Sequence, residues 1–294
     1  MPNVKANGID IEYEEFGDRR GRPLLLIMGL GAQMILWRED FCKQLAQRGH
    51  RVIRFDNRDV GKSSTLDHLG LPNVMAAVTA TLLRQPVSAP YLLRDMAADA
   101  AALLDVLGIK RAHVVGASMG GMIAQALAIE HPQRVLTLTS IMSTTGNPNL
   151  PPAKPAALSA LLMPPPTDRQ QSIERAVTVF RTIGSPGFPF DEAEIRELAA
   201  RSYDRGFNPD GVARQFVAIV ASGSRTDALK AVKVPALVIH GKDDPLVPVE
   251  GAYDTAAAIS GAQLLVIDGM GHDLPRPAWP RVIDAISTLT ARSH

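Results

Sequence analysis

Residues 114–121 read Val-Val-Gly-Ala-Ser-Met-Gly-Gly, and they decide the fold. An apolar strand pattern runs into G-x-S-x-G, and an apolar helical pattern follows at once. A serine at such a turn is held in a strained backbone that projects its hydroxyl from the top of a parallel sheet. Gly116 and Gly120 allow neighbouring segments to approach where a side chain would clash. The stretch predicts a nucleophile, Ser118, because an ordinary strand-to-helix turn would explain the glycines but not the serine.

A nucleophilic serine needs a base that takes its proton, and the base needs an acid that fixes its tautomer. In the fold that this turn indicates, the chain order is serine, then Asp or Glu, then histidine. Four histidines follow Ser118, namely His131, His240, His272 and His294. The first ends a helix pattern, the second ends a strand pattern and the last ends the chain. His272 lies in a glycine-flanked loop where an imidazole can reach over the sheet edge, so His272 is the predicted base.

The acid is expected after the apolar run 234–240, at the carboxyl end of a strand. The residues that follow are Gly241-Lys242-Asp243-Asp244-Pro245. Two adjacent carboxylates cannot both point at one imidazole, and we choose Asp244, which Pro245 restrains, over Asp243. An acid after the strand pattern 135–142 is the known alternative arrangement. That pattern continues into Ser143-Thr144-Thr145 and offers no carboxylate, so the alternative fails.

Several further motifs accompany the predicted triad. They are the turn Met28-Gly29-Leu30 with Trp37 downstream, the D-x-R-x-x-G-x-S loop at 56–63, the run Gly116-Ala117-Ser118-Met119-Gly120, the acid loop Asp244-Pro245 and the run Gly269-Met270-Gly271-His272. With these motifs the chain resembles, along nearly its whole length, serine esterases of the α/β-hydrolase fold. Within that fold it is similar to the aclacinomycin methylesterase-like carboxylesterases. It departs at Asp59-Val60, where Gly-x is common, and the resemblance does not transfer a substrate.

An oxyanion hole is the second requirement of acyl transfer by a serine. One donor is expected to be the backbone N–H of Met119, the residue after the nucleophile, and the other comes from the loop after the apolar run 24–28. The resemblance to the His-Gly-x loop of the superfamily implies that this second donor is the Leu30 N–H. Met28 replaces the histidine of that loop, which removes a side-chain hydrogen bond that often braces it. Backbone donation is unaffected.

Three residues beside these loops are expected to contact the substrate: Gly29, Trp37 and Met142. Gly29 opens the oxyanion loop, although an ordinary strand-exit turn also accounts for it. Trp37 follows that loop and either lines the acyl pocket or packs in the core. Met142 would add a pliable apolar wall, whereas packing in the core is the commoner role of methionine.

Strand and helix patterns alternate along most of the chain, which is typical of α/β proteins. Residues 9–16 alternate in polarity and predict an antiparallel edge strand. The alternation stops between 144 and 230, where proline clusters bracket short amphipathic helical pieces. We therefore predict an α/β-hydrolase core of residues 1–143 and 231–294, with a mostly parallel central sheet flanked by helices. Residues 144–230 are predicted to form an inserted, mostly helical cap over the serine.

Composition limits the classes of protein that remain. The 294 residues are 46% hydrophobic and 21% charged, as in globular proteins, and the formal net charge of +1 gives no reason to expect nucleic acid or a membrane as partner. Cys42 is the single cysteine and the start lacks an apolar signal core, so the cytoplasm is the expected location. The sequence has no phosphate loop, dinucleotide fingerprint or metal-spaced Cys/His cluster. We expect no cofactor and no metal.

A cap over the serine would exclude water and add an apolar wall, which favours an ester with a hydrophobic part. The sequence therefore predicts a serine carboxylesterase that hydrolyses small-to-medium hydrophobic carboxylic esters through an acyl-enzyme. A lactonase, a thioesterase, an amidase or a carbon–carbon bond hydrolase uses the same triad, and these alternatives stay open. A receptor without catalytic activity on the same scaffold is a further alternative, which the complete triad disfavours. The small-molecule ester is the only partner expected, and the oligomeric state stays open.

Overall fold

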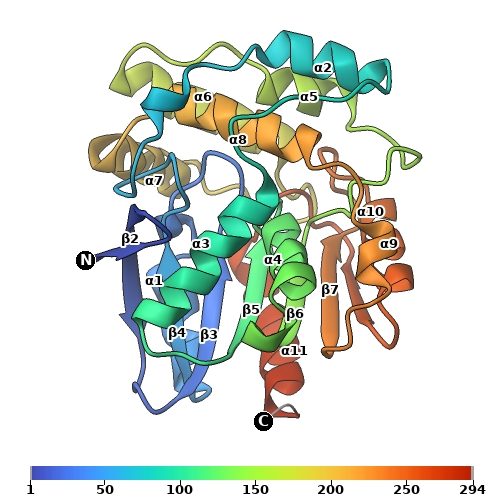
Figure 1. The fold of residues 1–294 in the computed structure, drawn as a ribbon. Helices are drawn as coiled ribbons and strands as arrows, with labels where there is room; N and C mark the ends of the chain where they lie inside the picture. The colour runs from blue at the N-terminus through green and yellow to red at the C-terminus, as the bar shows by residue number, and fades with distance from the viewer. Residues whose placement is uncertain (1, 293–294) are drawn as a thin grey trace.

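A computed structural model describes residues 2–292 and builds them around a central β-sheet (Figure 1). Within these residues the sheet has eight strands in the order β1-β2-β4-β3-β5-β6-β7-β8. The strands are β1 (Asn3–Ala6), β2 (Ile9–Phe16), β3 (Arg22–Ile27), β4 (His50–Phe55), β5 (Ala112–Ala117), β6 (Val135–Ile141), β7 (Ala236–Gly241) and β8 (Gln263–Ile267). β4, β3 and β5 to β8 run parallel, which confirms the predicted fold class. His294 lies outside the described residues.

The edge strand predicted at 9–16 is antiparallel to β4, but it is not the edge. β1 pairs with its outer side, with Val4 opposite Ile11, and takes the edge position instead. β1 and β2 are joined by a tight turn through Asn7 and Gly8, which both have positive φ. This hairpin escaped the sequence pattern because β1 has four residues and is mostly exposed, so it carries little periodic signal.

The register between β3 and β5 explains how the proposed site is assembled. Along β3, Leu24 and Leu26 face one layer of helices while Leu25 and Ile27 face the other, so the strand reads as a continuous apolar run. Gly116 of β5 lies opposite Ile27 of β3. Since both strands end at the same edge, the loop after β3 lies beside the serine turn after β5.

Helices cover both faces of the sheet (Figure 1). One face carries α1 (Glu39–Gln47) and α11 (Trp279–Ala291), and the other carries α3 (Leu93–Val106), α4 (Met119–Glu130) and α10 (Glu250–Ala258). Short 3-10 helices occupy Met34–Leu36, Asp67–Leu69, Pro132–Arg134 and Arg276–Ala278. The two apolar layers between helices and sheet form the core of the molecule, because each helix turns its buried stripe toward the strands.

Five helices lie between β6 and β7 along the chain: α5 (Pro155–Leu161), α6 (Arg169–Ile183), α7 (Glu192–Arg205), α8 (Pro209–Ala221) and α9 (Thr226–Leu229). The first four lie above the carboxyl edge of the sheet, whereas α9 packs beside α4 and α10 (Figure 1). α2 (Val74–Leu82), which comes from the connection between β4 and α3, packs on α8. The layer over the sheet edge therefore includes a helix from outside the predicted range 144–230.

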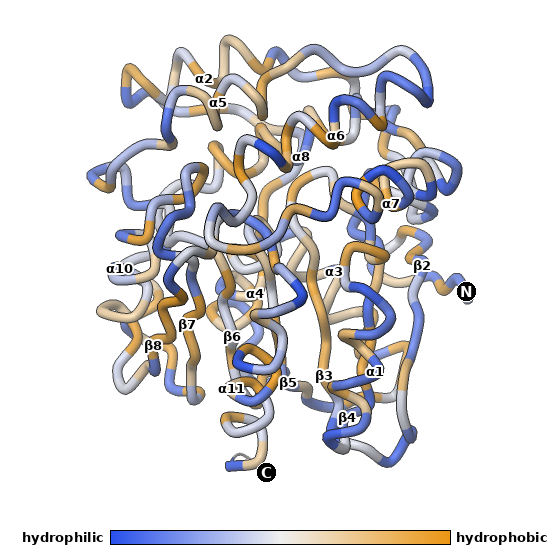
Figure 2. The backbone as a smooth tube through the Cα atoms, turned by 180° about the vertical axis from the view of Figure 1, so that it is seen from behind, coloured by the Kyte–Doolittle hydropathy of each residue, from blue (hydrophilic) through white to orange (hydrophobic). Residues whose placement is uncertain are grey.

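Hydrophobic residues are concentrated along the central strands, while hydrophilic residues are frequent in the outer turns (Figure 2). Among residues 2–292, no helix combines the length and the apolar character that crossing a bilayer requires.

Candidate active site

Ser118 occupies a sharp turn between β5 and α4, with φ of 56° and ψ of −122°. The surrounding glycines have no room for a side chain. A Cβ on Gly116 would lie 2.0 Å from the Gly120 carbonyl oxygen, and one on Gly120 would lie 2.1 Å from the Ile27 carbonyl oxygen. The G-x-S-x-G glycines thus let α4 pack against β5 and β3, and the tight packing holds the serine in its strained conformation.

The side chains of Ser118, His272 and Asp244 form one hydrogen-bonded line. Nε2 of His272 lies 2.9 Å from Oγ of Ser118, and Nδ1 lies 2.7 Å from Oδ2 of Asp244. An ionised carboxylate only accepts hydrogen bonds, so Nδ1 carries the proton and donates to Asp244. Nε2 is then the acceptor for the serine hydroxyl, which is the tautomer that general-base chemistry needs.

Asp244 is buried, and its environment favours the charged form. Oδ1 accepts hydrogen bonds from the backbone N–H groups of Leu246 at 2.9 Å and Val247 at 2.8 Å. Burial by itself would raise the pKa of Asp244, but the interactions with His272 and His240 outweigh it and hold the pKa below its ordinary value. The carboxylate is therefore ionised at neutral pH, ready to stabilise an imidazolium at His272.

Asp243, the rejected neighbour, points elsewhere. Its Oδ2 accepts a hydrogen bond of 2.8 Å from the backbone N–H of Gly269, and its side chain is exposed. Asp243 thus joins the loop after β7 to the loop that carries His272. The two adjacent carboxylates have separate partners, and Asp244 alone contacts the imidazole.

The loop after β3 lies directly against the serine. A Cβ on Gly29 would be 3.1 Å from Cβ of Ser118 and 3.5 Å from its Oγ. Within residues 2–292, the N–H groups of Leu30 and Met119 donate to no backbone or side-chain acceptor. Both predicted oxyanion donors are therefore available to a ligand oxygen.

Met28 cannot make the side-chain hydrogen bond of the family's histidine, and other residues hold the loop instead. Nδ2 of Asn57 donates to the Met28 carbonyl oxygen at 2.9 Å, and Oδ1 of Asp56 accepts from the Met34 N–H at 2.7 Å. Both residues belong to the D-x-R-x-x-G-x-S loop after β4. The loop that presents Leu30 is thus held at both ends by its neighbour in the sheet.

Of the three residues expected to contact substrate, only Gly29 lies against the serine. Trp37 is 1% exposed and stacks on Phe41 with ring centroids 5.6 Å apart, in the core layer under α1 and α11. Met142 is buried in the same layer at the end of β6. The structure thus places the Trp37 ring against α1 in the core, and a contact of Trp37 with substrate stays a prediction.

The segment 144–230 contacts the loop of His272 through residues that the sequence patterns did not single out. The Ile183 carbonyl oxygen accepts a hydrogen bond of 2.7 Å from the His272 N–H, and Oγ of Ser185 accepts one of 2.9 Å from the Gly271 N–H. Ser185 in turn donates to Asp273. These residues lie at the end of α6 and carry no recognisable motif, so no sequence signal could have found them.

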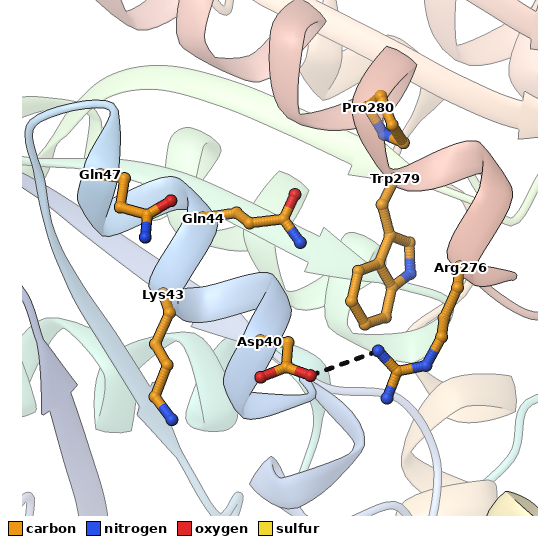
Figure 3. A pocket seen from close by; sticks show the side chains of 7 residues that line it. All are labelled: Asp40, Lys43, Gln44, Gln47, Arg276, Trp279 and Pro280. Atoms are coloured by element: carbon orange, nitrogen blue, oxygen red, sulfur yellow. Dashed lines mark hydrogen bonds and ion pairs between the residues drawn. The ribbon is translucent and has the colours of Figure 1, made fainter.

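The structure has a surface pocket beside α1 and α11 and another beside α6 and the loop after β7. One lies between α1 and α11, and its lining includes none of the triad residues (Figure 3). It is lined by Asp40, Lys43, Gln44, Gln47, Arg276, Trp279 and Pro280. The other lies between the cap and the acid loop and includes Ser185, Phe188 and Asp243. Its lining also includes none of the triad residues, although Asp243 precedes Asp244 in the chain and Ser185 contacts the His272 loop.

The sheet order, the serine turn and the position of the histidine loop define a protein class. A family model described as the α/β hydrolase fold matches residues 22–275, and the chain belongs to that family.

Similar proteins share the whole length of the chain. Rhodomycin D methylesterase DnrP of Streptomyces peucetius and its counterpart DauP of Streptomyces sp. (strain C5) are each 32% identical, over 98% of this chain and 97% of theirs. Among solved structures, the meta-cleavage product hydrolase CumD of Pseudomonas fluorescens is 22% identical and superposes with a TM-score of 0.75, covering 99% of this chain and 98% of its own. The structural likeness shows the fold alone.

Proposed function

We propose that the chain is a serine carboxylesterase with Ser118 as nucleophile, His272 as general base and acid, and Asp244 as the residue that orients and stabilises the imidazole. The observation that carries the proposal is the unbroken line of hydrogen bonds from Ser118 through His272 to Asp244, beside two available N–H donors. Membership of the hydrolase family and the likeness to two methylesterases support it.

In the first half-reaction, Nε2 of His272 takes the proton of the Ser118 hydroxyl while Oγ forms a bond to the ester carbonyl carbon. The carbonyl oxygen becomes an oxyanion that accepts hydrogen bonds from the Leu30 and Met119 N–H groups. His272 then gives the proton to the alkoxide as the ester C–O bond breaks. The alcohol leaves, and the acyl group stays on Ser118.

In the second half-reaction, His272 takes a proton from a water molecule whose oxygen attacks the acyl carbon. The same two N–H groups hold the second oxyanion. Breakdown of this intermediate returns the proton to Oγ of Ser118 and releases the carboxylic acid. Asp244 remains ionised throughout, because its interactions with His272 and His240 outweigh burial and hold its pKa low.

The proposed substrates are small-to-medium carboxylic esters with a hydrophobic part. The pocket between the cap and the acid loop is lined in part by Phe180, Phe188 and Phe190, which supports an apolar substrate group beside the acid loop. The methylesterase relatives support a small alcohol part and a larger acyl part. An ester panel that varies the acyl and alcohol parts separately tests this, and a preference for long alcohols over methyl would contradict it.

Replacement of the serine tests the central assignment. Ser118→Ala should lower the hydrolysis of p-nitrophenyl butyrate by at least about 10⁴-fold and abolish the mass increase given by an alkyl fluorophosphonate. Ser143→Ala is the matched control, since its hydroxyl lies close by and donates to the Ser118 carbonyl oxygen at 2.8 Å. This control should still be labelled. Labelling of Ser118→Ala, or no esterase activity in the wild type, would refute the proposal.

The adjacent aspartates test the choice of acid. Asp244→Asn should lower kcat by about 10⁴-fold, because the amide favours the wrong histidine tautomer. Asp243→Asn keeps an oxygen that can accept from the Gly269 N–H and should change kcat by less than about 10-fold. Steady-state kinetics on p-nitrophenyl butyrate measure both. The reverse ranking would transfer the role to Asp243.

A further inference from the structure

The oxyanion loop is a tight turn whose middle peptide is half-buried beneath α8. The Ala32 N–H donates to the Gly29 carbonyl oxygen at 3.2 Å, which closes a turn over residues 29–32. Gly31, the third residue of the turn, has φ of +64°, as type II turns require. In such a turn the N–H of the third residue points outward and needs a partner outside the turn. Water usually supplies it, but here α8 covers the turn.

Gln215 of α8 supplies that partner. Its Oε1 accepts a hydrogen bond of 2.9 Å from the Gly31 N–H, and its Nε2 donates to the Arg58 carbonyl oxygen at 2.7 Å. The side chain is 0% exposed, so no water competes for either contact. The amide therefore joins the turn after β3 to the loop after β4 across the cap interface.

Packing fixes the same turn from two sides. From the core, Ser118 lies 3.1 Å from the position that a Gly29 Cβ would take. On the cap side, the Val212 methyl groups lie 3.0 and 3.1 Å from the position that a Gly31 Cβ would take. Leu30, whose N–H is the proposed second oxyanion donor, lies between these two glycines. With α8 packed against the turn, leaving the half-buried Gly31 N–H unpaired costs free energy, so the hydrogen bond helps to hold the shape of the turn.

We propose that Gln215 is a positioning residue for the oxyanion hole, so that the cap sets the direction of the Leu30 N–H. The inference rests on the proposed esterase function. Without the amide, the half-buried Gly31 N–H loses its acceptor beneath α8, and the turn rotates to find another. Leu30 then moves with it, and transition-state stabilisation falls. The cap thus contributes to the chemical step as well as to substrate binding.

Two substitutions separate the acceptor from the rest of the side chain. Gln215→Met keeps the length of the side chain and removes both hydrogen bonds, while Gln215→Glu keeps an oxygen for the Gly31 N–H. For p-nitrophenyl butyrate, Gln215→Met should lower kcat by about 10- to 100-fold with KM within about three-fold, because the oxyanion forms only in the transition state. Gln215→Glu should recover most of that loss.

A transition-state analogue supplies the readout that a purely structural role would not move. On binding an alkyl trifluoromethyl ketone, Oγ of Ser118 adds to the carbonyl carbon, its proton passes to His272 and the ketone oxygen becomes an oxyanion. The inhibition constant of the ketone should rise in Gln215→Met by the same factor by which kcat falls. Gln125→Met is the matched control, since Gln125 is a buried helical glutamine that hydrogen-bonds Ser140 and Arg225. It should lower stability with kcat within about three-fold.

Equal losses of kcat in Gln215→Met and Gln125→Met, or a raised KM with unchanged kcat, would overturn the proposal. Should Gln215→Met fail to fold, amide hydrogen exchange of Gly31 decides in the wild type and Gln215→Glu. The proposal expects slow exchange in both, and rapid exchange in the wild type would overturn it. Inactivity of the wild type towards every ester would instead remove the proposed function, and the Gly31 exchange rate would still report on Gln215.

Discussion

α8 and α2 lie side by side over the carboxyl edge of the sheet, yet they are attached to the molecule by different forces. α8 is joined to the core loops by buried polar contacts, the strongest of which joins Arg214 to both carboxylate oxygens of Asp59 at 2.7 and 2.9 Å. α2 is apolar but buries only Ala77 completely, and Met75 and Leu82 are 64% and 80% exposed. We therefore expect α2 to be more mobile than its neighbour α8.

The layer over the sheet edge is therefore not held uniformly. Lifting α8 would expose the buried Arg214–Asp59 pair and strip the acceptor from the Gly31 N–H. Moving α2 would break mainly apolar contacts with α8. If the site admits substrate by a movement of the cap, α2 therefore moves at a lower cost in free energy than α8. The following changes test that difference, in order of decreasing effect.

Removing the buried arginine should produce the largest loss of stability. Arg214→Met leaves the buried Asp59 carboxylate without its cation and should lower the free energy of unfolding by about 3–5 kcal/mol. Arg169→Met is the control, because Arg169 and Asp204 form an ion pair that is half exposed, and its unfolding midpoint should hardly change. Urea unfolding followed by circular dichroism measures both. Similar midpoints for the two variants would mean that α8 is no better anchored than an exposed helix.

Amide hydrogen exchange compares the two helices within one molecule. Amides of α2 should exchange at least ~100-fold faster than those of α8, because few buried contacts oppose the opening of α2. Exchange followed by mass spectrometry on peptides that cover 74–82 and 209–221 gives the ratio. Equal protection of the two peptides would remove the distinction on which this comparison rests.

Substitution of Gly31 tests the close approach of α8 to the oxyanion turn. Gly31→Ala adds a methyl group 3.0 Å from Val212, whereas Gly108→Ala adds one in open space at nearly the same φ, +67° against +64°. Backbone strain is common to both, so the additional loss in Gly31→Ala, about 1–3 kcal/mol, reports overpacking against α8. The double variant Gly31→Ala/Val212→Ala should recover part of this additional loss of stability, which a double-mutant cycle measures. Equal losses of stability in Gly31→Ala and Gly108→Ala would show that α8 moves away from the added methyl group at little cost in free energy.

Truncation of an exposed α2 side chain should have the smallest effect. Leu82→Ala should change the free energy of unfolding by less than about 0.5 kcal/mol, because the side chain is already in water. Val217→Ala on α8 removes less volume but should cost about 2 kcal/mol, since Val217 is 1% exposed. Thermal or urea unfolding measures both. A larger loss for Leu82→Ala would indicate that α2 buries a face against another molecule in solution.

The sequence could predict the fold class because its strongest signals are local. The G-x-S-x-G turn around Ser118 lies within five residues, and the apolar runs of β3 and β5 reflect burial on both faces. β1 was missed because four mostly exposed residues carry no periodic burial. The role of Trp37 was open in the sequence, since an indole suits a pocket and a core equally well. Its stacking on Phe41 of α1 exists only in the folded chain.

For the proposed site, the chain order of Ser118, Asp244 and His272 was enough to select the three side chains, since each follows a strand that ends at one edge. Gln215 could not be selected in the same way. It lies in a helix that carries no motif, glutamine is a common residue, and its proposed role depends on the Gly31 N–H, 184 residues away in the chain. No periodicity or motif encodes such a distant contact.

The sequence alone determined which residues stand at strand ends and which segments are apolar on one face or two, because local backbone geometry and burial repeat along a chain. The folded structure was needed to show which loops touch and which side chain accepts from the Gly31 N–H. Those choices depend on angles and distances between segments far apart in the chain. They are fixed by the packing of the whole molecule, in which each buried polar group must find its partner.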